Sequence, residues 1–224
     1  MIVTVHQPDF LPWLGFFKRW KQSDAYIVLD DVQFIRRGWH HRDKIKTAQG
    51  VKWLTVPVKK KSRYYKKISE VEIDYHENWQ QSHFGIVKAA YSKAENFDLV
   101  FDTFTNIYLK NHRFLIDLNM DFLKFCAAQL RIDTPVLKAS SYFTKETKSR
   151  KLLELVNAVG GSVYLTGSGS MDYLDEKIFS EAGVEVRWQK YEQPIYPQLH
   201  GKFEKMLSVL DYLMVSPRPY DILP

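Results

Sequence analysis

The chain has a single cysteine among its 224 residues, so no disulfide can form within it and a cysteine-based metal site is not expected. Cys126 lies in an apolar stretch with helical spacing, which favours a core position. No run of eighteen or more apolar residues is present, so no membrane-spanning helix is predicted. The first residues are strand-like and lack the basic start and cleavage site of a signal peptide. We therefore expect a soluble, cytoplasmic protein with no membrane insertion.

Several catalytic motifs are also missing. No G-x-S-x-G elbow marks a serine hydrolase, and no G-x-G-x-x-G run marks a dinucleotide fold. Residues 166–170, Thr-Gly-Ser-Gly-Ser, lack the Gly-Lys-Ser/Thr ending of a P-loop. The adjacent His40 and His41 do not have the spacing of zinc ligands. These absences disfavour the corresponding enzyme classes.

The residues that are present suit a globular protein with an acidic partner. Hydrophobic residues make up 45% of the chain and aromatic residues 15%, enough to bury a full core. The formal net charge is +6. A basic chain attracts nucleic acid, anionic membrane or phosphorylated small molecules.

Short apolar runs alternate with segments of helical spacing, which predicts an α/β fold with a mainly parallel central sheet flanked by helices. Buried strands are expected at residues 2–5, 25–29, 136–138, 163–165 and 184–188. A small hairpin insertion is expected from strands 44–47 and 53–58 around Gln49-Gly50, and a strand with one wet face at 68–73. Helices are expected at 13–21, 79–94, 97–108, 112–130, 146–159, 175–182 and 203–214.

We interpret residues 1–224 as one domain. Residues 1–75 and 135–190 form its sheet, residues 76–134 its helical part, and residues 191–224 a closing loop and helix.

The first polar segment, His6-Gln7-Pro8-Asp9, directly follows the strand at 2–5. Ligands of open α/β sheets bind just beyond the carboxyl ends of strands. Pro8 and Pro12 stiffen this elbow, which favours His6 and Gln7 as ligands of a phosphate or carbonyl, with Trp13 as a flat wall. Alternatively, the segment is an elbow in which His6 satisfies backbone groups.

The second polar segment begins with Asp30-Asp31 at the end of the next strand. Either carboxylate could ligate Mg²⁺ or act as a base. Arg36 and Arg42 have the planar forks that suit phosphate or carboxylate. Gln33, Trp39 and His40 complete a dense polar and aromatic loop, expected beside the first. In the alternative, one Asp caps a turn and the arginines pair with it at the surface.

Two further segments carry polar groups. Thr166-Gly167-Ser168 follows a strand and precedes a helix, where backbone N–H groups can cradle an anion; a plain flexible turn is the alternative. The basic segment 59–67, which includes Arg63, Tyr64 and Tyr65, is interpreted as a solvated loop, with a nucleic-acid patch as its alternative. Lys59 follows a strand and could reach a ligand.

These segments together resemble the WbqC-like protein family across nearly the whole chain. The resemblance is carried by Gln7-Pro8, Pro12-Trp13-Leu14-Gly15, Ser23-Asp24, Leu29-Asp30-Asp31-Val32-Gln33-Phe34, Trp39-His40-His41-Arg42, Trp53-Leu54-Thr55-Val56-Pro57-Val58, Tyr164-Leu165-Thr166-Gly167, Tyr173-Leu174-Asp175 and Ser208-Val209-Leu210-Asp211. The family is associated with bacterial surface polysaccharide and O-antigen gene clusters. The resemblance implies the modification of a nucleotide sugar or glycan precursor.

A fold-level analogy links the first elbow to pantothenate synthetase and related nucleotidyltransferases, which bind ATP there and form an amide through an acyl adenylate. The His-x-Gly-His spacing of those enzymes is absent, because Gly15 lies nine residues after His6.

We therefore expect an enzyme, a transferase or an ATP-dependent amide-forming ligase, that places an amino-acid group such as glycine, or an acyl group, on a nucleotide-linked sugar. A non-catalytic nucleotide-sugar binding protein is the alternative, and the need for ATP or Mg²⁺ stays open. The expected catalytic residues are His6, Asp30 and Asp31. The expected substrate-binding residues are Gln7, Trp13, Gln33, Arg36, Trp39, His40, Arg42, Lys59, Thr166, Gly167 and Ser168. No nucleic-acid partner is expected.

Overall fold

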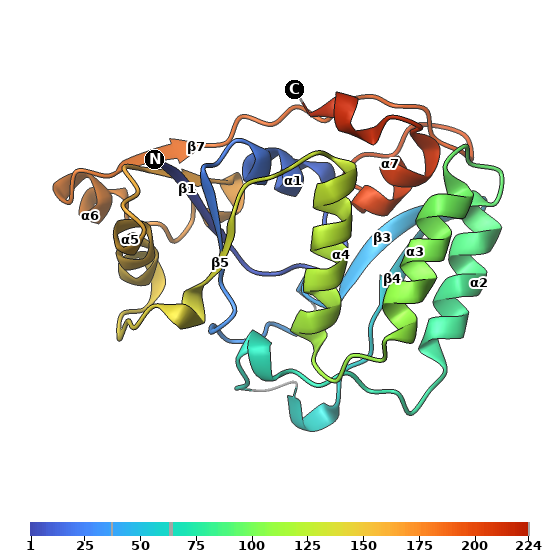
Figure 1. The fold of residues 1–224 in the computed structure, drawn as a ribbon, viewed down its shortest axis with the longest axis horizontal. Helices are drawn as coiled ribbons and strands as arrows, with labels where there is room; N and C mark the ends of the chain where they lie inside the picture. The colour runs from blue at the N-terminus through green and yellow to red at the C-terminus, as the bar shows by residue number, and fades with distance from the viewer. Residues whose placement is uncertain (37, 63–64, 224) are drawn as a thin grey trace. The chain divides into compact units, whose positions relative to one another are not determined.

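The computed structural model describes residues 1–36, 38–62 and 65–223 (Figure 1). Arg37, and Arg63 and Tyr64 of the basic segment, lie outside the described residues. The chain forms two compact units. Unit 1 comprises Met1–Gln7, Gly15–Asp31 and Ile132–Glu192, and unit 2 comprises Pro8–Leu14, Val32–Arg131 and Gln193–Pro224.

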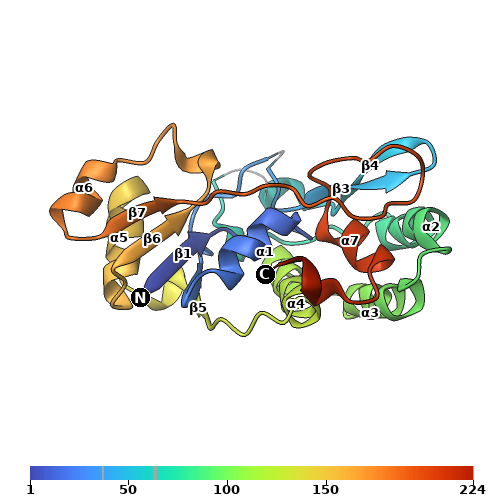
Figure 2. The ribbon, with the colours of Figure 1, turned by 90° about the horizontal axis from the view of Figure 1, so that it is seen from above.

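Unit 1 is built on a five-stranded sheet in the order β5-β2-β1-β6-β7, in which every pairing is parallel. Figure 2 shows β1, β6 and β7 side by side. The strands are β1 (Ile2–His6), β2 (Ala25–Val28), β5 (Val136–Lys138), β6 (Val163–Thr166) and β7 (Glu185–Trp188). Numbered by their succession in the unit, they lie in the order 3-2-1-4-5, that of a doubly wound sheet.

The central strands are apolar on both faces because helices cover both faces. Ile27 of β2 packs in the cluster of Val3, Leu155 and Phe179, beneath α5 (Lys148–Ala158) and α6 (Glu176–Glu181). The neighbouring Tyr26 contacts aromatic rings of α1 (Leu14–Lys21) instead. Successive side chains of a strand point to opposite faces, so the fully buried sequence AYIV satisfies both layers.

Unit 2 combines helices with a β-hairpin. The hairpin consists of β3 (Arg42–Thr47) and β4 (Gly50–Thr55), paired antiparallel from Arg42 opposite Thr55 to Thr47 opposite Gly50. Its turn uses Gly50 at φ +99°, a conformation that favours glycine. The helices are α2 (Trp79–Tyr91), α3 (Phe97–Leu109), α4 (Leu115–Gln129) and α7 (Val209–Val215), and α3 contacts both α2 and α4 (Figure 1).

Five short 3-10 helices complete the described chain: η1 (Lys60–Ser62), η2 (Ile68–Glu70), η3 (Ala139–Ser141), η4 (Ser168–Ser170) and η5 (Pro219–Ile222). In the described residues, no helix combines the length and apolar character needed to cross a membrane.

The predicted α/β class is confirmed, with a mainly parallel central sheet, flanking helices and a small hairpin. Three predicted elements differ most. The second hairpin strand spans Gly50–Thr55 instead of residues 53–58. Residues 68–73 form η2 and isolated bridges instead of a strand, because their backbone partners come one at a time from other segments. The last helix begins at Val209 instead of residue 203, because Met206 has a positive φ and Ser208 caps the helix by accepting from the Leu210 N–H.

Candidate functional site

The sequence-predicted residues of unit 1 gather at the carboxyl ends of three neighbouring strands. His6 ends β1, Asp30 and Asp31 follow β2, and Thr166 ends β6. Because β1 pairs in parallel with both β2 and β6, these ends meet at one edge of the sheet. The chain builds outward from β1 in one direction and then from β6 in the other, so a topological switch point lies between β1 and β6. Doubly wound sheets bind their ligands in the crevice at such a point.

His6 is held in a defined tautomer at this edge. Its Nδ1 lies 2.9 Å from the carbonyl oxygen of Gln7, and a carbonyl only accepts, so Nδ1 carries the proton. When the ring is neutral, its Nε2 atom is a hydrogen-bond acceptor. The edge of the imidazole packs against Phe16 of α1, with ring centroids 5.0 Å apart. His6 therefore satisfies a backbone group, as one interpretation of the sequence expects.

The two aspartates after β2 have different partners. Asp30 is buried, and its carboxylate accepts hydrogen bonds from the backbone N–H of Ser140 at 2.9 Å and the Ser140 hydroxyl at 2.6 Å. Asp31 pairs with Lys151 of α5 at 2.5 Å through Oδ2. Its buried Oδ1 has no hydrogen-bond partner among the described residues. Asp30 is thus committed to the end of β5, while Asp31 retains an oxygen that can accept a proton.

A cation lies directly against the turn after β6. A Cβ atom added to Gly167 would fall 2.4 Å from Nη1 of Arg19, so glycine lets the guanidinium of α1 approach the backbone. Arg19 is buried, and it donates to the Gln189 side-chain oxygen at 3.3 Å. Gln189 in turn donates to the Gly15 carbonyl at 2.9 Å, which fixes the pair.

Hydroxyl groups complete this edge. The buried Thr166 hydroxyl donates to Ser170 at 3.1 Å, and Ser170 lies 3.0 Å from the Tyr173 hydroxyl. Gln7 is half-buried and Ser168 exposed. The edge therefore offers an imidazole, a carboxylate oxygen and several hydroxyls, with a buried guanidinium beside them.

Unit 2 contains the other half of the predicted set. Two of these residues, Arg36 and Arg42, line one pocket of about 290 Å³. His41 and Thr55 also line it, together with apolar walls from Phe34 and residues 56–58. His41 is fixed because its Nδ1–H donates to the Val56 carbonyl at 3.0 Å.

Trp39 lies at the surface against a residue that the sequence analysis did not select. Its ring centroid is 5.5 Å from that of Trp53 on β4, and both rings are about half exposed, at 50% and 44%. The Arg42 guanidinium lies 4.6 Å from the centroid of Trp53. Trp53 stands in a segment that carries the family resemblance, which is the one signal that could have found it.

His40 is buried in a polar cluster instead of facing solvent. Its Nδ1–H donates to Asp9 Oδ1 at 3.0 Å, and Asn119 of α4 donates to the backbone carbonyls of His40 and Pro8, both at 2.7 Å. His40 Nε2 and Asn119 Oδ1 are buried with no partner among the described residues. Burial raises the pKa of the nearby Asp43 well above its usual range; the Lys44 N–H opposes this rise and the charge of Asp9 adds to it.

The remaining predicted residues of unit 2 make structural contacts. Trp13 forms an isolated antiparallel bridge with Ser208, and Gln33 forms one with Lys67. Lys59 pairs with Glu72 at 2.5 Å, and Glu72 also accepts from Arg113 at 3.2 Å. These two cations lower the pKa of Glu72 to about 2.

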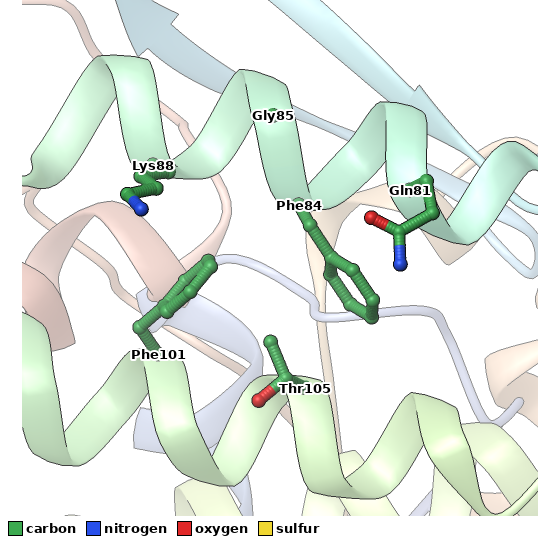
Figure 3. A pocket seen from close by; sticks show the side chains of 6 residues that line it. All are labelled: Gln81, Phe84, Gly85, Lys88, Phe101 and Thr105. Atoms are coloured by element: carbon green, nitrogen blue, oxygen red, sulfur yellow. The ribbon is translucent and has the colours of Figure 1, made fainter.

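A second pocket of unit 2 contains none of the predicted residues. It has a volume of about 360 Å³ and lies between α2 and α3, with Phe84 and Phe101 facing each other across it (Figure 3). Its polar groups are Gln81, Lys88 and Thr105. Within the described parts of the chain, no cluster of three or more His, Cys, Asp or Glu residues could hold a metal ion.

Two comparisons with known proteins give a match. The model of the WbqC-like protein family matches residues 7–219, which covers residues of both units. An uncharacterized protein of Mycobacterium tuberculosis is 34% identical over 213 residues, which cover 94% of this chain and 92% of the relative. No solved structure matches the chain. On the family match and this relative together, the chain belongs to the WbqC-like protein family.

Proposed function

We propose that this protein binds a nucleotide-linked sugar at the carboxyl ends of β1, β2 and β6 and transfers an amino-acid or acyl group onto it. The observation that carries the proposal is the switch point between β1 and β6, with His6 on one side and Thr166 and Gly167 on the other. Nucleotides bind doubly wound sheets in this crevice. The nucleotide ligand is inferred by analogy with other doubly wound sheets. The side chains at this edge supply groups that could bind it.

The charge of the edge suits a diphosphate group. The guanidinium of Arg19 lies beside the Gly167 backbone in a buried setting, where its field is weakly screened by water. The hydroxyls of Thr166, Ser170 and Tyr173 can donate to phosphate oxygens. The net charge of +6 would attract such a ligand.

The chemistry of group transfer needs a proton acceptor. An amine that forms an amide loses a proton as it attacks the activated carbonyl, and a neutral imidazole or a carboxylate can take it. His6 Nε2 is an acceptor nitrogen in the tautomer observed, and Asp31 Oδ1 is an unpartnered buried oxygen among the described residues. Asp30 has both oxygens bonded to Ser140, so we assign it a positioning role.

ATP would activate the carboxylate as an acyl adenylate or acyl phosphate, and Mg²⁺ would accompany the phosphates. As the amine forms the C–N bond, the C–O bond to the phosphate group breaks and AMP or phosphate leaves. Apart from Asp31 Oδ1, the oxygens of Asp30 and Asp31 bond to Ser140 and Lys151, so the described residues do not form a Mg²⁺ site of their own. The resemblance to the WbqC-like family favours bacterial surface polysaccharide biosynthesis as the setting of such a reaction.

Product formation tests the proposal. The protein is incubated with ATP, Mg²⁺, glycine and a panel of UDP- and dTDP-linked sugars that includes uronic acids, and conjugates are detected by mass spectrometry. We expect one glycine-bearing nucleotide sugar. Calorimetric binding of a nucleotide sugar without any conjugate would instead identify the non-catalytic binding protein.

Two glycines of one turn provide a matched pair of variants. Gly167→Ala must displace the Arg19 guanidinium, whereas a Cβ at Gly169 meets nothing within 4 Å. We expect Gly167→Ala to weaken nucleotide-sugar binding at least tenfold and Gly169→Ala to leave it unchanged. Equal affinity of Gly167→Ala and the wild type would remove the switch-point assignment.

A further inference from the structure

At the end where Arg42 pairs with Thr55, the hairpin of unit 2 has one buried face and one open face. Asp43, Ile45 and Leu54 point inward and are buried. Because successive side chains of a strand alternate, Arg42 and Lys44 share the opposite face with their cross-strand partners. Those partners are Thr55 and Trp53, which are exposed. The open face thus carries two cations and a large aromatic ring.

Trp53 and Trp39 form an aromatic platform on this face. Their ring planes are inclined by 35° with centroids 5.5 Å apart, and each ring leaves about half its surface exposed. Large apolar rings gathered at a surface mark interaction sites. Arg42 stacks over Trp53 at 4.6 Å, so the platform ends at a guanidinium.

The same Arg42 lines the neighbouring pocket of about 290 Å³. Arg36 and His41 contribute further polar groups there, and Phe34 and Pro57 contribute apolar walls. Concave sites with mostly apolar walls and a few convergent polar groups are the usual form of small-molecule sites. The volume is near the lower end of their range, about 300 Å³, which suits one ring better than a long chain.

We propose that the Trp39–Trp53 platform and the Arg36–Arg42 pocket bind a saccharide ring that carries a carboxylate or phosphate group. The guanidinium forks match either anion. The tryptophan faces match the C–H face of a pyranose, whose other face and edges stay polar. An inorganic anion would make no use of the rings, and a neutral sugar would make no use of the two arginines.

This inference uses residues of unit 2 alone and goes beyond the proposed group transfer. Saccharide binding to unit 2 would stand if no transfer were found, and the converse also holds. The binding experiment therefore contains no ATP and no nucleotide sugar.

Calorimetric titration of the full chain tests the proposal with five probes: methyl glucuronide, glucose 6-phosphate, methyl glucoside, inorganic phosphate and UMP. We expect one of the two anionic sugars to bind at least tenfold more tightly than methyl glucoside and phosphate. Whichever is tighter identifies the carboxylate or the phosphate as the natural anion. Tighter binding of UMP than of either sugar would overturn the saccharide assignment in favour of a base on the platform.

Three variants localise the site. Trp53→Leu removes the exposed platform ring, and Arg42→Gln removes the shared guanidinium. We expect each to weaken binding at least tenfold. Arg113→Gln is the matched control, because Arg113 is also exposed and stacked on an aromatic ring, Phe114 at 5.0 Å, but lies outside the pocket lining. Full affinity in both site variants, with unchanged circular dichroism, would refute the site; so would the absence of binding by both anionic sugars.

Discussion

Arg19 places a buried guanidinium against the backbone of Gly167, and His83 places a buried imidazole between two elements of unit 2. Arg19 donates to the Gln189 side chain. Burial keeps the His83 ring neutral at pH 7.

The contacts of His83 show why. The backbone N–H of Thr55 donates to its Nε2 at 3.2 Å, so Nδ1 carries the proton and bonds the Tyr108 hydroxyl at 2.9 Å. Burial lowers the pKa of His83 to about 4. A protonated ring would lose the bond from Thr55, because Nε2 would then also be a donor.

This shift predicts a loss of stability on mild acidification. The unfolded chain protonates His83 near pH 6.5, and the folded protein only near pH 4. The stability that the neutral His83 ring contributes is fully present above pH 6.5. It is lost as the pH falls toward 4, which lowers the free energy of unfolding by about 3 kcal/mol for a shift of this size. Urea unfolding at several pH values measures it, and we expect His83→Gln to show a shallower decline than the wild type over this window.

The comparison of the two proteins isolates His83 from other titrating groups. Asp43 and Asp211 have pKa values raised by burial, so they favour the folded state as the pH falls. Both are present in the variant and cancel in the difference. Parallel stability curves for wild type and His83→Gln between pH 6.5 and 4 would contradict the prediction.

At the scale of elements, β2 is tied to the segment after β5 by one buried carboxylate. Asp30 accepts both the backbone N–H and the hydroxyl of Ser140, at the start of the turn that leads from β5 toward α5. This tie complements the backbone pairing of Val28 with Lys138. It fixes the end of β2, where Asp31 forms an ion pair with Lys151.

Removing the charge of Asp30 should therefore weaken the fold as well as the site. In Asp30→Asn, the amide oxygen can accept from the Ser140 N–H and the amide nitrogen can donate to the Ser140 hydroxyl, so two bonds to a charged carboxylate become neutral bonds. We expect a loss of about 1–3 kcal/mol in the free energy of unfolding. Denaturant unfolding gives this value.

A double-mutant cycle with Ser140→Ala shows whether the tie is the cause. The two losses should be less than additive, because the residues share one contact. Asp172→Asn serves as control, since Asp172 is exposed. Unchanged stability of Asp30→Asn with lost turnover would assign Asp30 to catalysis instead of positioning.

Element by element, the sequence predicts most of unit 1. The strand at Val136–Lys138 has the bounds expected, and β1, β2 and β6 differ by one residue each. Buried parallel strands are continuous apolar runs, so composition alone marks them. The strand predicted at residues 68–73 is wrong. The alternation of Ile and Glu with Val fits a strand, but the backbone partners of this segment are single residues of other segments. Local periodicity carries no information on such partners.

The site is less predictable than the strands. The polar segments after β1, β2 and β6 could be found, because strand ends in the sequence are strand ends in space. Arg19, Ser140 and Lys151 could not, because each stands in a segment with another local role and meets its partner across more than a hundred residues. Helical spacing indicates that Arg19 is in a helix, but does not say that its guanidinium reaches the Gln189 side chain.

At the scale of the whole molecule, the chain alternates between the two units in six segments. Neither unit is one continuous stretch of sequence. Unit 2 takes Pro8–Leu14 from the first elbow, and this short segment is held there by the Asp9 bond to His40 and by a bond from Ser208 to the Leu11 carbonyl at 2.7 Å. Truncation cannot separate the units cleanly, so a test of each must use the full chain.

Hydrogen exchange of the full chain offers that test, because it reports on each segment separately. A nucleotide-linked sugar should slow exchange in peptides of unit 1 that contain residues 5–7 and 163–170, since these form the switch-point edge. An anionic monosaccharide should slow exchange in residues 50–58 of unit 2, around Trp53 and the pocket. The two ligands are thus expected to give different protection maps.

The control and the contrary result follow from the same maps. Peptides of α3 that line the pocket of Phe84 and Phe101 should exchange equally with and without either ligand, because no proposed contact lies there. Protection of α3 by the nucleotide sugar, with none at residues 163–170, would move the nucleotide site away from the switch point. Protection of residues 50–58 by the nucleotide sugar alone would show that unit 2 recognises the nucleotide, and that the platform and pocket do not select an anionic sugar.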